Sequence, residues 1–150
     1  MRKFDENGLR LAKSQANMFV ESISRYNCGS NYFIRRFMNS DICFWIDRFD
    51  EFDISSVFNA LEKDYQFETG KEKFSVDSIY WIGYLYRYWA YTYEIYSVEI
   101  YKIITAKELN NIYEAYHSLD PDLAIKRIYE AKKIKPEKNM LAIMKKVYNK

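Results

Sequence analysis

The sequence predicts an all-α fold, a compact bundle of six to eight helices around a central aromatic-rich helix at about residues 76–95. Three observations support this. Apolar residues recur at helical spacing, capping residues precede most of these stretches, and only four Gly and two Pro interrupt 150 residues. Strict apolar–polar alternation is absent, although the strand propensity of Tyr and Phe leaves a short hairpin open. We expect a single helical domain over residues 1–150, with a core that needs no disulfide or metal.

The first two helices follow from periodicity and from their ends. Residues 9–23 are amphipathic, and this helix is expected to end near Gly29 because glycine favours helix C-termini. Ser30 is expected to cap the second helix. That helix is predicted to bend or break at residues 39–41 and to continue to about Phe49.

Residues 53–74 are predicted to form a third helix followed by the most polar loop in the chain. Asp53 precedes an apolar repeat over residues 54–65, which indicates another capped helix. Residues 66–74, QFETGKEKF, are predicted to be a loop. Either Ser75 or Asp77 then caps the following helix.

The predicted central helix covers residues 79–93. It is apolar nearly all round, and such a helix is typical of the middle of a domain. Gly83 costs helix propensity there, so we interpret it as allowing close packing against a neighbouring helix.

The last third of the chain carries the clearest start signals. A short helix is predicted at about 97–104, and Thr105 with Glu108 forms a capping box for the next. Asp120-Pro121 combines an N-cap acid with proline at the first helical position, and that helix should end before Pro136. A final amphipathic helix is predicted at about 140–148, with lysines opposite its apolar side.

The charge is unevenly distributed although the net charge is only +2. Residues 41–68 hold eight acids and two bases, whereas residues 126–150 hold nine bases and two acids. Two interpretations stay open: solvated faces that attract each other across one domain, or two docking surfaces of opposite sign.

The sequence also bears on the compartment. Cys28 and Cys43 match no zinc or CxxC motif and are expected to be reduced thiols. The first fifteen residues lack the apolar stretch of a signal peptide, and residues 78–93 are too short and too polar for a membrane span. We therefore expect a cytoplasmic protein without membrane contact.

Groups that carry chemistry are scarce. The chain has one histidine, His117, which excludes most metal sites and histidine relays. A hydrogen-bonded loop histidine is the simpler interpretation, and a general base held by Asp120 is the alternative. Four scattered glycines form no phosphate loop. We expect no catalytic residue, no metal and no cofactor.

The segment YWIGYLYRYWAYTYE, residues 80–94, stands above this background. Much of it should be core, yet each buried tyrosine hydroxyl needs a partner, and Tyr, Trp and Arg are enriched at protein interfaces. Arg87 in its middle is either in a buried ion pair or an anchor for a partner. The interface residues predicted here are Tyr80, Trp81, Tyr84, Arg87, Tyr88 and Tyr91.

Three segments resemble a known family: GSNYFIRRFMNSD (29–41), YWIGYLYRYWAYTYE (80–94) and YHSLDPDLAIKRI (116–128). The resemblance spans about residues 29–131. It is to small bacterial proteins typically encoded beside an ADP-ribosyltransferase-like toxin, which look like the antitoxin partners in such operons. The polar landmarks of that pattern, present here, are Arg35, Arg36, Arg87, His117 and Asp120.

The resemblance implies a protein that binds and neutralises a cognate toxin, with these landmarks and the aromatic segment as its partner-binding residues. One alternative is an enzyme acting on a nucleotide or nucleic acid, in which the five landmarks converge in one pocket. Another is a nucleic-acid-binding regulator that uses the basic C-terminal segment. No helix-turn-helix signature supports that alternative well. We expect only weak nucleic-acid binding, because the lysines of that segment alternate with an apolar side that should pack on the domain.

Overall fold

The computed structural model describes residues 1–136, and within them the chain forms eight α-helices and no β-strand. The predicted all-α bundle is therefore confirmed, whereas the helix predicted at 140–148 lies outside the described residues. The helices are α1 (Glu6–Arg25), α2 (Ser30–Met38), α3 (Asp41–Phe49), α4 (Ile54–Asp64), α5 (Val76–Tyr93), α6 (Ser97–Ile103), α7 (Ala106–Tyr116) and α8 (Pro121–Lys132).

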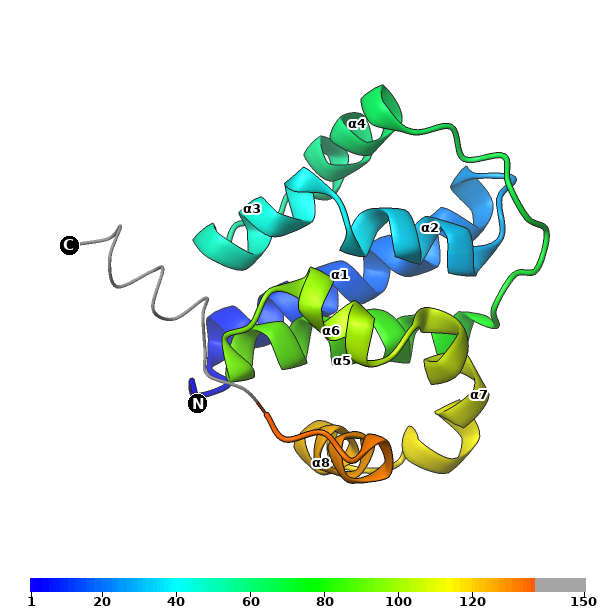
Figure 1. Cartoon of the computed structure of the whole chain (residues 1–150). Coiled ribbons are helices and arrows are strands. Elements are labelled where there is room, and N and C mark those ends of the chain that lie inside the picture. Colours follow the sequence, from blue (N-terminus) through cyan, green and yellow to red (C-terminus); the bar gives the residue numbers. More distant parts are fainter. Residues whose placement is uncertain (137–150) are drawn as a thin grey trace.

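Helices α1 and α5 pack along each other and form the middle of the molecule (Figure 1). On one side of this pair lie α2, α3 and α4; α8 lies on the opposite side, with α7 leading to it. Helix α5 also contacts α6, α7 and α8, so the prediction of a central aromatic-rich helix is confirmed. None of the helices in residues 1–136 is long and apolar enough to cross a membrane.

Local sequence signals fix most helix starts. A bend or a break was predicted at residues 39–41, and the structure shows a break. The Ser40 side chain caps α3, which begins there. Ser75, rather than Asp77, caps α5. The predicted capping box of Thr105 and Glu108 is formed at α7, and Asp120 caps α8 ahead of Pro121.

The prediction that Ser30 caps α2 is wrong. The N-cap is Gly29, which has no side chain to do so, and Ser30 is the first helical residue. The Ser30 hydroxyl instead accepts a hydrogen bond of 3.0 Å from the backbone N–H of Phe74. The backbone of Gly29 donates to the carbonyl of Thr69, and that of Ser30 to the carbonyl of Glu72. The loop of residues 66–74 thus supplies the partners that make a conventional cap unnecessary.

Gly83 allows the close approach of α1 and α5, as the sequence predicted. A Cβ atom added at Gly83 would lie 2.9 Å from Ala16 Cα and 3.0 Å from the Phe19 ring. The Gln15 amide also donates a 3.0 Å hydrogen bond to the Gly83 carbonyl. A side chain at position 83 would therefore push the two central helices apart.

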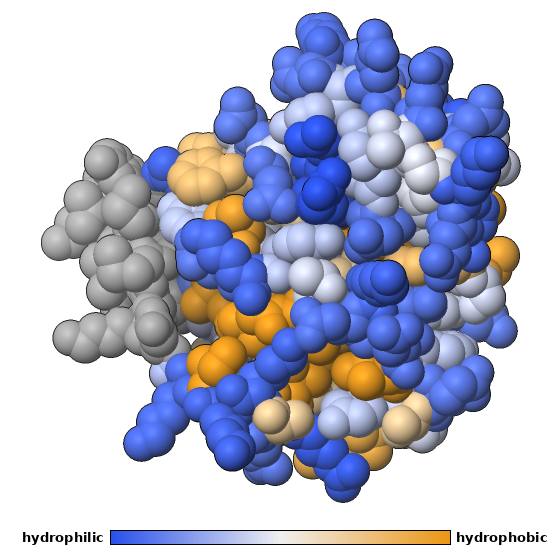
Figure 2. Space-filling model, turned by 45° about the vertical axis from the view of Figure 1, so that its right-hand side comes forward, coloured by the Kyte–Doolittle hydropathy of each residue, from blue (hydrophilic) through white to orange (hydrophobic). Residues whose placement is uncertain are grey.

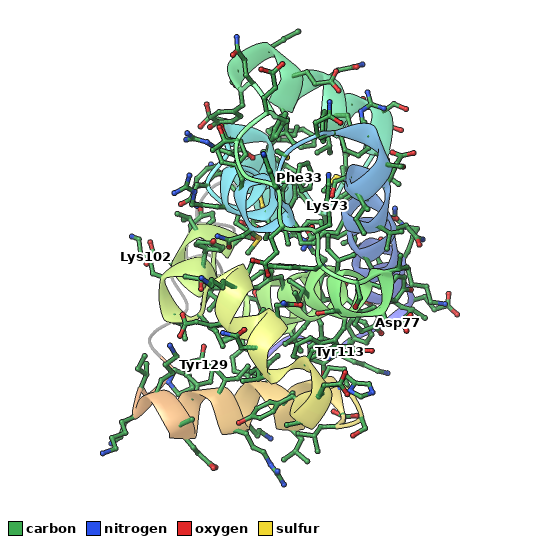
Figure 3. The ribbon with its side chains drawn as sticks, turned by 90° about the vertical axis from the view of Figure 1, so that its right-hand side faces the viewer. Phe33, Lys73, Asp77, Lys102, Tyr113 and Tyr129 are labelled. Carbon is green, nitrogen blue, oxygen red and sulfur yellow. The ribbon has the colours of Figure 1, made fainter. Side chains whose placement is uncertain are left out.

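Aromatic residues of α5 that enter the core find partners for their polar atoms. The Tyr86 hydroxyl donates to the Ile104 carbonyl at 2.7 Å. The Trp89 indole N–H donates at 3.0 Å to the hydroxyl of Tyr129, whose side chain extends from α8 toward the rest of the bundle (Figure 3). These bonds satisfy the polar atoms that make tyrosine and tryptophan costly in a core.

Candidate partner-binding surface

Arg87 and Tyr91 belong to the core, and for Arg87 the structure shows the buried ion pair that was one of the two predicted options. Arg87 is 2% exposed and Tyr91 is 3% exposed. The Tyr91 hydroxyl donates to Asp5 at 2.6 Å, which ties the N-terminus of α1 to α5. Both side chains are used by the fold, so contact of either with a partner stays a prediction that the described structure does not support.

Arg87 is the centre of a buried polar network that joins four helices. Its guanidinium donates to Asp47 of α3 at 2.6 Å and to Gln15 of α1 at 2.9 Å. It also lies 3.5 Å from the Cys43 sulfur and 3.4 Å from the Ser97 hydroxyl. Asp47 in turn accepts hydrogen bonds from the backbone N–H and the hydroxyl of Ser97, each 2.7 Å long. Nearly every polar atom of the pair is thus satisfied inside the protein.

The charges in this network are set by burial and by mutual attraction. Burial by itself lowers the pKa of Arg87, but the Asp47 carboxylate raises it above its ordinary value. Burial also raises the pKa of Asp47, against the opposing effects of Arg87 and Ser97. Burial raises the pKa of the Cys43 thiol to about 12, so this thiol is protonated at neutral pH and is a poor nucleophile.

The other predicted residues of α5 are half-buried. Tyr80 and Tyr84 stack on each other with ring centroids 6.4 Å apart, and Trp81 meets the ring of Tyr113 on α7 edge to face. Tyr88 is covered by Phe4 from the N-terminal segment, at a centroid distance of 4.5 Å. Much of each ring therefore packs within the domain, and contact of the remaining surface with a partner stays a prediction.

Arg35 and Arg36 lie in the last turn of α2, where the helix dipole favours positive charge. Both guanidinium groups lie over the ring of Tyr32, at 5.6 and 5.2 Å, and that of Arg36 also lies 5.0 Å from the ring of Tyr65. Arg35 is exposed, and Arg36 is partly covered. These arginines therefore form a cationic and aromatic surface on α2.

His117 and Asp120 lie between α7 and α8 and have local roles. His117 Nδ1 is 2.8 Å from the Tyr113 carbonyl, and its ring stacks on that of Tyr113 at 4.4 Å. Asp120 accepts a hydrogen bond from the backbone of Asp122 as the cap of α8. Arg87 is enclosed elsewhere in the core, so the described contacts do not bring the five polar landmarks into one catalytic pocket.

A groove of about 760 Å³ lies between α3 and α4. Its lining includes one face of each helix and the residues that connect them. The apolar residues that line it are Ile42, Trp45, Ile46, Phe52, Val57, Ala60 and Leu61. Acids are concentrated among the other lining residues: Asp41, Glu51, Asp53 and Asp64, with Arg10 of α1 as the one base.

Three large aromatic side chains on α3 are exposed, and one of them, Trp45, lines this groove. Phe44 is 42% exposed, Trp45 is 43% exposed and Phe49 is 45% exposed. Trp45 and Phe49 pack together at 4.8 Å between centroids, and Phe44 stacks on Tyr96 at 4.5 Å. Trp45 and Phe49 thus form an exposed apolar pair at the groove, whereas Phe44 lies against Tyr96 at the start of α6.

The exposed aromatic residues of α3 were not among the predicted partner-binding residues. A usable signal was present: Phe44 and Trp45 are adjacent, flanked by the apolar Ile42 and Ile46, in a helix of nine residues. One short helix has one face to bury. With Cys43, Ile46 and Asp47 turned inward, the two aromatics point outward.

Within residues 1–136, no group of three or more His, Cys, Asp or Glu side chains is arranged to hold a metal ion. No family model matches the chain, and neither a curated protein nor a solved structure shows a significant match. The resemblance to antitoxin-like proteins therefore remains a prediction from the three sequence segments.

Proposed function

We propose that this protein acts by binding another protein, and that it does so through the exposed aromatic residues of α3 and the adjoining α3–α4 groove. The observation that carries the proposal is the exposed pair of Trp45 and Phe49, each more than 40% exposed and packed together at the groove that Trp45 lines. Exposed apolar surface next to a groove marks interaction sites in soluble proteins. Tryptophan is also among the residue types enriched at the few positions that dominate the binding energy of protein interfaces.

The partner class we propose is a cognate toxin, which makes the protein an antitoxin of the neutralising type. Support for this class comes from the sequence segments that resemble antitoxin-like proteins encoded beside ADP-ribosyltransferase-like toxins. The geometry adds indirect support, because the polar landmarks Arg35, Arg36, Arg87, His117 and Asp120 lie in separate environments. That arrangement favours binding over an Arg/His/Asp catalytic pocket.

The test is copurification of the chain with the product of the adjacent gene, followed by substitution of Trp45. Trp45→Ala is expected to weaken the complex by about 2 kcal/mol, or about 30-fold in Kd, if Trp45 is a hot spot. Because Trp45 is 43% exposed, the variant should keep its helical circular dichroism.

The matched control is Leu123→Ala, which removes a side chain that is 41% exposed. Leu123 is on α8, which lies on the opposite side of the α1–α5 pair from α3 (Figure 1). It should leave the affinity unchanged. Equal loss of affinity in both variants, or none in Trp45→Ala, would remove α3 as the binding surface. A failure of the adjacent gene product to bind the unmodified chain would remove the toxin as the partner.

A further inference from the structure

We propose that the groove between α3 and α4 accepts a cationic amphipathic helix of the partner protein, with lysines or arginines on one side of that helix and apolar residues on the other. The inference rests on the proposed function, because it names the chemistry of the segment that binds at the same surface. Three observations carry it: an apolar floor between two helices, acids that the fold leaves unpaired, and a basic lining in a second recess.

The shape and floor of the groove favour a helix as its ligand. Five of its seven apolar lining residues are aliphatic, and all five belong to α3 or α4. An apolar groove of this kind accepts the apolar side of an amphipathic helix. The nine residues of α3 and the eleven of α4 give it a length of about 14–17 Å, close to three turns of a bound helix. Residues 1–136 form no β-strand, so an extended peptide finds no sheet edge there.

The fold leaves the acids of the groove without a cation. Four acids line it: Asp41, Glu51, Asp53 and Asp64. Among residues 1–136, no ion pair involves any of the four. Arg10, the one base of the lining, donates a 2.6 Å hydrogen bond to the side chain of Asn7 instead. The resulting negative potential favours a partner segment of positive charge.

The position of Asp64 makes its charge unfavourable in the free protein. Asp64 is the last residue of α4, and the dipole of a helix disfavours negative charge at its C-terminus. Asp41 and Asp53, in contrast, lie at the starts of α3 and α4, where the dipole favours an acid. Local helix energetics therefore account for the acids at the helix starts but not for Asp64. A cation of the partner beside Asp64 would offset this cost.

A second recess has the opposite charge. It has a volume of about 700 Å³ and lies between α8 and the N-terminus. Its lining includes Lys126, Lys133 and Lys135 against a single acid, Glu130. Figure 2 also shows hydrophobic side chains gathered in the lower half of one face, at the height of α5, α6 and α8. Apolar surface is thus present elsewhere, but the lysines of the second recess repel a cationic helix, so charge directs that helix to the α3–α4 groove.

The test titrates the isotope-labelled full chain with a synthetic peptide of leucines and lysines, about four helical turns long, in which the leucines fall on one side. One control peptide has glutamate in place of every lysine, and another has the same composition in an order that gives no apolar side. We expect the lysine peptide to shift the amide NMR signals of groove residues such as Ala60 and Asp64, and to spare those of α8. It should bind at least about tenfold more tightly than either control.

Two double variants provide the matched comparison. Glu51→Gln with Asp64→Asn neutralises two exposed acids of the groove, and neither substitution removes a helix cap. Glu68→Gln with Glu114→Gln makes the same charge change at exposed sites outside the groove lining. The first variant should bind the lysine peptide about threefold more weakly or worse, and the second should bind it as the unmodified chain does. In urea unfolding, Asp64→Asn alone should be at least as stable as the unmodified chain, because it removes an unfavourable charge from the end of α4.

Each other outcome overturns the inference. Equal binding of the lysine and glutamate peptides, shifts confined to α8, or the same loss of affinity in both double variants would remove the cationic helix as the ligand. Groove signals that shift as the concentration of the protein alone is raised would assign the groove to a second copy of the chain. No toxin is present in this experiment, so its failure leaves the proposed function standing. A failed copurification removes the toxin as the partner and leaves the chemistry of the groove standing.

Discussion

Removal of the Arg87 side chain is the most direct test of the argument that the middle of α5 is core and not interface. Arg87→Met keeps much of the side-chain volume but deletes the positive charge and four hydrogen-bonding contacts, to Gln15, Cys43, Asp47 and Ser97. The Asp47 carboxylate would then be left in the core with Ser97 as its remaining partner.

The expected loss follows from the burial of both partners. The side chains of Arg87 and Asp47 are 2% and 1% exposed, so water cannot replace the lost contacts. Removing one member of such a pair typically costs about 3–5 kcal/mol, because a buried charge is left uncompensated. Domains of this size are commonly stable by about 5–15 kcal/mol, so the variant should be close to unfolding.

A second substitution separates charge from packing. Asp47→Asn in the Arg87→Met background removes the unpaired charge, while the amide oxygen can still accept a hydrogen bond from the Ser97 N–H. The double variant should therefore regain about 2 kcal/mol relative to Arg87→Met alone.

Urea unfolding, followed by circular dichroism, measures these differences in the free energy of unfolding. A loss below about 1 kcal/mol in Arg87→Met would refute the assigned role of the pair. So would a double variant less stable than Arg87→Met. If Arg87→Met instead kept full stability and weakened partner binding, Arg87 would belong to an interface.

Two further variants test the packing of α5 and the state of its tyrosines. Gly83→Ala should lower the free energy of unfolding by about 1 kcal/mol or more, because crowding against Ala16 outweighs the gain in helix propensity; a rise in Tm would contradict this. Burial and the hydrogen bond to Asp5 raise the pKa of Tyr91 to about 12 from an ordinary 10.0, so the unfolded chain ionises first. Stability, complete below pH 10, should fall as the pH rises from 10 to 12, less steeply in Tyr91→Phe. Urea titrations at successive pH values, with tyrosinate absorbance as a second readout, check it; a flat profile would contradict it.

Local chemistry made much of the fold predictable. The starts of α4, α7 and α8 follow from caps that act within a few residues, which is why the sequence located them. The central position of α5 was also predictable, because a helix that is apolar nearly all round has to be covered on most sides.

Ser30 shows where local reasoning stops. A serine at that position can cap a helix, but the side chain instead binds the backbone of Phe74, forty-four residues away. Nothing within a few residues of Ser30 reveals that partner. The same limit applies to Arg87, for which the sequence allowed both a buried pair and an interface anchor. Only the packing of α3 and α6 against α5 brings Asp47 and Ser97 to it.

By itself, the sequence determined the helical class, the order of the described helices and the central place of the aromatic segment, since these depend on periodicity and capping. Only the tertiary structure decided which aromatic residues are covered. It enclosed Tyr86 and Trp89 and left Phe44, Trp45 and Phe49 exposed. The physical reason is that exposure depends on which neighbours a helix face meets, and those neighbours come from distant parts of the chain.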